Sequence, residues 1–138
     1  IVEPICEKLG VTLLTATPLA PVPRSFMGRF YSDNHVLICS SEHEGGPMPV
    51  LESLASCRPV ISTNVGIVPE LVRDGHNGLI FERSRSGLEE SIRKLISNPK
   101  MVETMHKNLV KDKFERYTEN MLQSYYQMFE SLESQGAD

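Results

Sequence analysis

The feature that most constrains the fold is a glycine-rich turn and a helical pattern enclosed by two continuous apolar runs. The first run is Val36–Cys39 and the second is Pro59–Ile61. Continuous apolar runs are typical of parallel strands that are buried on both faces. Between them, residues 48–57 repeat apolar side chains with the period of a helix. The order strand, turn, helix, strand therefore predicts a parallel sheet with helical crossovers.

The same alternation continues on both sides of this unit. We expect strands over residues 12–15, 36–39, 60–63 and 79–81, and short helices over residues 24–31 and 68–72. C-terminal helices follow over residues 87–134, with a break at Asn98–Pro99 and a third helix from Thr118. These patterns predict an α/β fold, a Rossmann-like parallel sheet flanked by helices.

We expect one partial domain over residues 1–138. Residues 2–10 have the pattern of a helix end that Gly10 closes, which indicates an N-terminally truncated piece of a longer protein. The net charge of −4 leaves no basic stripe for nucleic acid. No apolar run approaches the roughly 20 residues that span a bilayer, and no signal-peptide pattern is present.

The cysteines are far apart in the sequence, at Cys6, Cys39 and Cys57. Such an odd set without pair spacing predicts reduced, buried thiols in a cytoplasmic protein.

Right-handed crossovers place the carboxyl ends of parallel strands on one rim of the sheet. The rim then collects Ser40, Ser41, residues 44–46 and residues 64–66. Bare glycine amides and a helix N-terminus favour an anion such as a diphosphate. The amides in question are those of Gly45, Gly46, Met48, Val50 and Leu51.

Glu44 and Glu52 stand on either side of these amides. Carboxylates accept hydrogen bonds from hydroxyl pairs, so the two side chains suit a sugar and a ribose on either side of a diphosphate. In the alternative interpretation Glu44 is a solvated loop charge and Glu52 a surface helix residue. Sequence spacing alone leaves both interpretations open.

The segment Glu44–Glu52 resembles the Glu-seven-residues-Glu motif of the retaining glycosyltransferases of family 4, the glycosyl transferases group 1 with the GT-B fold. Residues 29–41 resemble the helix, strand and serine pair that precede the motif. Residues 51–63 resemble the family's Leu-Glu-Ala-Met-Ala-x-Gly-x-Pro-Val-Ile-x-Thr, and residues 66–80 its Pro-Glu-Leu-Val and Asp-Gly-x-x-Gly segment. Residues 114–117 stand where the family often has Phe-Ser-Trp.

The resemblance implies the C-terminal, donor-binding domain of a hexosyltransferase that uses a nucleotide diphosphate sugar. Glu44 would contact the transferred sugar as the catalytic-site carboxylate, and Glu52 would bind the ribose. The residues from Gly45 to Leu51 would approach the sugar and the diphosphate. No cofactor or metal is implied. The implied partners are a missing N-terminal acceptor domain and an acceptor that is a glycan or a lipid. The longer protein could also associate peripherally with a membrane.

The sequence departs from the family pattern in three ways. Gly46-Pro47 replaces the common aromatic-glycine pair, and Cys57 replaces a glycine at a helix end, where a left-handed residue would be strained. The family's basic Arg/Lys pair is also missing, because Lys8 is the only basic residue among residues 1–20. We therefore expect this chain to bind a donor weakly and not to turn it over.

Further candidates for donor contacts are Ser41, His43, Asn64 and Gly66, which are expected on the same rim. Two other functions remain open: a non-catalytic module that binds a nucleotide sugar or a partner, and another GT-B activity such as an epimerase or a phosphorylase. The sequence does not determine the base, the sugar or the acceptor.

Overall fold

The computed structural model describes residues 1–16 and 20–112. At its centre lies a parallel sheet of three strands in the order β1-β2-β3, with β1 at Leu37–Cys39, β2 at Val60–Thr63 and β3 at Gly78–Phe81. Leu37 lies opposite Val60 in the first ladder, and Val60 lies opposite Gly78 in the second. The predicted parallel sheet is thus confirmed, with three of the four predicted strands.

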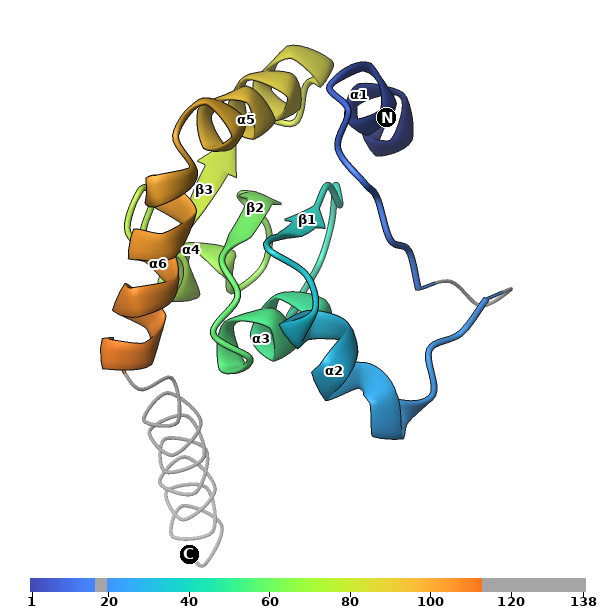
Figure 1. Ribbon diagram of the computed structural model, residues 1–138, viewed down its shortest axis with the longest axis vertical. Helices are drawn as coiled ribbons and strands as arrows, with labels where there is room; N and C mark the ends of the chain where they lie inside the picture. Colours follow the sequence, from blue (N-terminus) through green and yellow to red (C-terminus); the bar gives the residue numbers. More distant parts are fainter. Residues whose placement is uncertain (17–19, 113–138) are drawn as a thin grey trace, which may run out of the picture.

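Helices cover both faces of this sheet (Figure 1). Their bounds are α1 Val2–Lys8, a 3-10 turn Arg24–Phe26, α2 Met27–Ser32, α3 Met48–Ala55, α4 Val68–Leu71, α5 Arg85–Ser97 and α6 Pro99–Asp112. Helices α1 and α5 pack on one face, and α3 and α4 pack on the other. The result is the three-layer arrangement that the alternating sequence pattern predicts.

Two buried clusters hold the layers together, and the alternation of side chains along β2 feeds both. Ile61 packs under α1 and α5, whereas its neighbour Val60 packs under α3 and α4. Helix α6 contributes Met105 to the first cluster and Leu109 to the second. Strand β2 is buried on both faces and β3 nearly so, which fits their continuous apolar runs, whereas β1 at the edge of the sheet is half-buried.

The strand predicted over residues 12–15 is wrong, because these residues have no regular secondary structure. The apolar residues of this segment differ in burial: Val11 and Leu13 lie against the first cluster, while Leu14 is exposed. No described strand pairs with this segment, so it has no ladder to join.

The last helical region begins two residues earlier than predicted. Ser84 caps α5, since its hydroxyl accepts a hydrogen bond of 3.0 Å from the Gly87 amide. The predicted break is confirmed between α5, which ends at Ser97, and α6, which starts at Pro99. The helix expected from Thr118, the tail and residues 114–117 lie outside the described residues.

The cysteines are free, as predicted, but their predicted burial holds only for Cys6. Cys39 and Cys57 are half-buried, because each sits at the edge of the second cluster near the end of its element. Burial raises the pKa of the Cys6 thiol, which keeps it protonated.

Cys57 closes α3 in a left-handed conformation, with a φ of 55°. Its amide donates to the Leu54 carbonyl at 2.9 Å, and the Arg58 amide donates to the Ser53 carbonyl at 2.8 Å. These two bonds form a Schellman motif, in which glycine is favoured because it has no Cβ. The strain expected from the sequence is therefore present at this position.

Replacing Cys57 with glycine is expected to raise the free energy of unfolding by about 1 kcal/mol, because it relieves the left-handed strain. Urea titration followed by circular dichroism measures the change. Cys57→Ala is the matched control, since alanine removes the thiol but keeps the Cβ. A gain for alanine equal to the gain for glycine would show that strain is not the cause.

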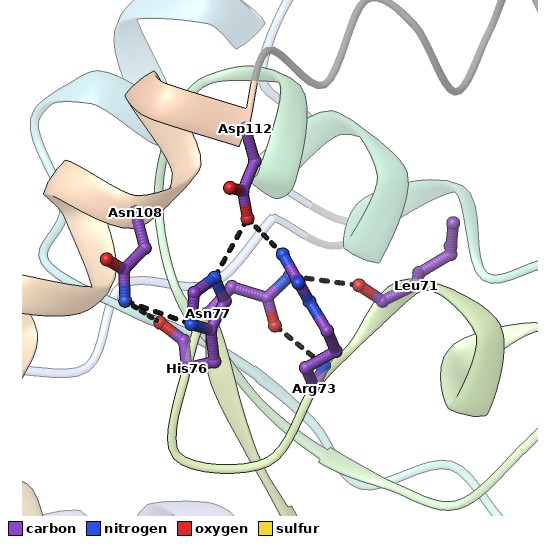
Figure 2. A network of polar contacts seen from close by, with 6 residues as sticks. All are labelled: Leu71, Arg73, His76, Asn77, Asn108 and Asp112. Carbon is purple, nitrogen blue, oxygen red and sulfur yellow. Dashed lines mark hydrogen bonds and ion pairs between the residues drawn. The ribbon is translucent and has the colours of Figure 1, made fainter.

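A polar network ties the end of α6 to the loop between α4 and β3 (Figure 2). The Asp112 carboxylate accepts hydrogen bonds from the Arg73 guanidinium and, at 2.8 Å, from Nε2 of His76. Asn108 donates to the His76 carbonyl at 2.8 Å. The His76 hydrogen bond, with Arg73 beside it, holds the pKa of the Asp112 carboxyl below its usual value. The carboxylate therefore stays charged and keeps the helix end on the loop.

Asn77 holds the same loop from inside, since only 5% of it is exposed. Its Oδ1 accepts a hydrogen bond of 2.8 Å from the Arg73 amide, and its Nδ2 donates to the Leu71 carbonyl at 3.0 Å. One amide side chain thus satisfies both a donor and an acceptor of the backbone where α4 ends.

Candidate functional site

The loops after β1 and β2 meet at the carboxyl edge of the sheet and form one rim. The Ile67 amide donates to the Gly45 carbonyl at 3.1 Å, and the Thr63 hydroxyl donates to the Ser41 carbonyl at 2.7 Å. Gly66 has a φ of 49°, and its backbone lies so close to the carbonyl oxygens of Glu44 and Gly45 that a Cβ would clash with both. Predicted site residues from two loops are therefore brought together.

Glu44 is exposed on this rim, and its Oε1 accepts a hydrogen bond of 2.9 Å from the Ser41 hydroxyl. Ser41 thus orients the carboxylate, a role the sequence left undefined. His43 and Asn64 are also exposed on the rim, and their side chains make no hydrogen bond to another described residue. Both side chains are accessible to a ligand, but neither takes part in the hydrogen bonds that hold the two loops together.

The set of free amides is smaller than the sequence predicted. The amides of Val50 and Leu51 donate to the Pro47 carbonyl, at 2.9 and 3.3 Å, because they belong to the first turn of α3. The amides of Gly45, Gly46 and Met48 make no hydrogen bond within the described chain. Val50 is fully buried and Leu51 packs on the second cluster, so both support the turn rather than offering donors.

Glu52 lies one turn into α3 and is half-buried. Its Oε2 accepts a hydrogen bond of 2.8 Å from the phenol of Tyr31 on α2. Both residues line a cavity of about 890 Å³ that is bounded by residues 11–16 and 34–38. Glu44 does not line this cavity, so the two carboxylates do not share it.

Arg83 is a rim residue that the sequence analysis missed. Its guanidinium pairs with the Glu42 carboxylate at 3.3 Å and donates to the Ser40 carbonyl at 3.4 Å. Arg83 follows β3 by two residues, so the rule that gathers the carboxyl ends of parallel strands could have placed it here. Lys8, by contrast, is bound to Glu89 at 2.9 Å, between α1 and α5.

Metal-ligating groups do not converge in the described residues, where no set of three His, Cys, Asp or Glu side chains could hold an ion. Over the same part of the chain, no helix combines the length and the apolar composition that a membrane span requires.

A sequence profile described as "Glycosyl transferases group 1" matches residues 19–112, the part that carries the sheet, the rim and α6. The chain belongs to this family. An uncharacterized glycosyltransferase of Methanocaldococcus jannaschii is 40% identical to this chain over 73 residues. The matched part makes up 52% of this chain and 21% of that protein.

Solved structures share the fold of this group 1 domain. Sucrose-phosphate synthase from Thermosynechococcus elongatus superposes with a TM-score of 0.67 at 23% identity, over 94% of this chain and 34% of that one. HepE of Anabaena, solved in complex with UDP, superposes with a TM-score of 0.60 at 22% identity, over 77% of this chain and 29% of HepE. The sheet and its helices thus match those of GT-B glycosyltransferases. The chain spans about a fifth of the curated relative and a third of these structures.

Proposed function

We propose that this chain is the C-terminal, donor-binding domain of a retaining glycosyltransferase of family 4, acting on a nucleotide diphosphate hexose. The observation that carries this proposal is the arrangement around α3, where three free amides lie between two carboxylates that do not share a cavity. Membership of the group 1 family supports a sugar transfer of this kind.

Each part of the arrangement suits one part of the donor. The amides of Gly45, Gly46 and Met48, with the N-terminal end of the α3 dipole, favour the diphosphate. Glu44, held by Ser41, suits the hydroxyls of the transferred sugar, and Glu52 suits those of the ribose. The UDP complex of HepE supports a nucleoside diphosphate as the ligand.

We propose that the transfer needs no metal ion. The amide dipoles and a cation at the rim can offset the charge that develops on a leaving diphosphate. We propose Arg83 for this role, since its guanidinium bonds the Ser40 carbonyl at the end of β1 and pairs with Glu42 on the rim.

We assign acceptor binding and turnover to parts of the enzyme outside this domain. We propose that the acceptor, a glycan or a lipid, is bound by an N-terminal domain, and that this chain alone binds the donor without turnover. The family relatives are several times longer than the part matched here, which supports this division. A cytoplasmic location, with peripheral membrane association where the acceptor is a lipid, fits the free cysteines.

Glu52→Gln is expected to weaken binding of the preferred nucleotide sugar by about 10- to 100-fold, because it removes a charged acceptor from the ribose hydroxyls. NMR titrations with UDP-, GDP-, ADP- and dTDP-sugars identify the ligand and measure its dissociation constant. Glu90→Gln, at an exposed position of α5, is the matched control and should leave the constant unchanged. Equal affinities for the two variants would contradict the assignment of Glu52.

A further inference from the structure

The phenol of Tyr31 is the hydrogen-bond donor that reaches Glu52 from another element. Tyr31 belongs to α2, only 5% of it is exposed, and its Oη lies 2.8 Å from Oε2 of Glu52. Oε1 of Glu52 accepts no hydrogen bond from a described residue. One carboxylate oxygen is therefore fixed, while the other has no hydrogen-bond partner in the described chain, and Glu52 lines the cavity.

The position of the phenol is itself constrained. Phe30 packs its ring against that of Tyr31, edge to face, with 5.7 Å between the ring centroids. The next residue, Ser32, accepts a hydrogen bond of 2.5 Å at its carbonyl from the guanidinium of Arg58, which enters from the loop between α3 and β2. The ring contact limits the movement of the Tyr31 side chain, and the Arg58 hydrogen bond ties the end of α2 to the segment that follows α3.

Tyr31 is suited to donate, and not to exchange protons, under ordinary conditions. Burial raises the pKa of the Tyr31 phenol, and the hydrogen bond to Glu52 raises it further. The proton therefore stays on the phenol, and the hydrogen bond always runs from Tyr31 to the carboxylate.

We propose that Tyr31 is a positioning residue for the nucleotide ribose: its phenol fixes the Glu52 carboxylate so that the free oxygen accepts the ribose hydroxyls. This inference rests on the proposed role of Glu52 in the donor site. A carboxylate on a helix surface otherwise samples several rotamers, and a ligand must order them at a cost in affinity. Fixing Oε2 in advance removes that cost and sets the direction of the acceptor.

A brace between α2 and α3 is the competing explanation of the same hydrogen bond. A brace stabilises the fold, whatever sugar the nucleotide carries. A positioning residue, in contrast, acts on a ribose and not on a 2′-deoxyribose, because only the ribose offers the full pair of hydroxyls. The ratio of the two affinities therefore separates the explanations.

The test compares UDP, GDP and ADP with dUDP, dGDP and dADP by NMR titration of the wild-type chain and of Tyr31→Phe. We expect the variant to bind the preferred ribonucleotide about 3- to 10-fold more weakly and the deoxynucleotide equally well. In a Glu52→Gln background, Tyr31→Phe should cause no further loss. Ser32→Ala is the matched control, because within residues 1–16 and 20–112 the Ser32 hydroxyl bonds only the Arg29 carbonyl on the same helix.

The possible results separate this inference from the proposed function. A wild-type chain that binds no ribonucleotide, or that binds both sugars equally, overturns the ribose site and this inference with it. Discrimination that Glu52→Gln abolishes but Tyr31→Phe preserves overturns only the role of Tyr31. A variant that loses affinity for both sugars alike, with a lower melting temperature, shows a brace and also overturns it.

Discussion

Gly66→Ala is expected to abolish nucleotide binding and to lower the free energy of unfolding by about 2–5 kcal/mol. A Cβ at this residue would stand 2.5 Å from the Glu44 carbonyl oxygen and still closer to that of Gly45. The loops after β1 and β2 would have to separate, breaking the hydrogen bond from the Ile67 amide to Gly45. The amides and the Glu44 carboxylate would then lose their common geometry.

Gly75→Ala is the matched control for this prediction. Gly75 has a φ of 74°, so alanine is strained there too, but no atom of the described residues outside its immediate chain neighbours lies within 4 Å of its Cβ position. We expect that variant to cost about 1 kcal/mol and to leave binding intact. Urea titration gives the stabilities, and NMR titration with the preferred nucleotide gives the affinities. Equal losses for the two variants would mean that the contact between the loops is unimportant.

The second large effect is expected at Asn77, where alanine should lower the free energy of unfolding by about 2–4 kcal/mol. The substitution leaves the Arg73 amide and the Leu71 carbonyl without the partners that Asn77 provides. Both groups lie where α4 ends and the loop to β3 begins, so the loop should loosen. His76, which follows Arg73 in this loop, would then hold Asp112 less well.

Hydrogen exchange of the α6 amides, together with urea titration, measures this effect. Exchange near Asn108 should accelerate in Asn77→Ala if the loop anchors the helix. Asn64→Ala, at an exposed rim position, is the control and should change stability by less than about 0.5 kcal/mol. An unchanged exchange rate in α6 despite a loss of stability would contradict the link between loop and helix.

Much of the fold could be predicted because its elements carry strong local signals. The run from Val60 is buried on both faces and forms a strand with the predicted bounds, and the predicted break between the two helices is confirmed at Asn98, with Pro99 in the first turn of α6. The strand over residues 12–15 was predicted from a short β-branched run, and such a run does not show whether a neighbouring strand is present to pair with it. Pairing is a property of the whole sheet and cannot be read from one segment.

The site was predictable where topology alone decides it. Ser41, Glu44 and Gly66 follow neighbouring parallel strands, and the structure places them together. Tyr31 was missed because its phenol reaches Glu52 across two packed helices, which no sequence spacing reveals. The amides of Val50 and Leu51 were misjudged because proline has no N–H, but its carbonyl still accepts from the first turn of the helix.

Helix α6, like β2, contributes to the buried clusters on both faces of the sheet. Met105 packs in the cluster on one face of the sheet, and Leu109 packs in the cluster on the other. Detaching this helix would uncover part of both clusters at once. Weakened packing of α6 is therefore expected to lower the stability of both faces of the sheet together.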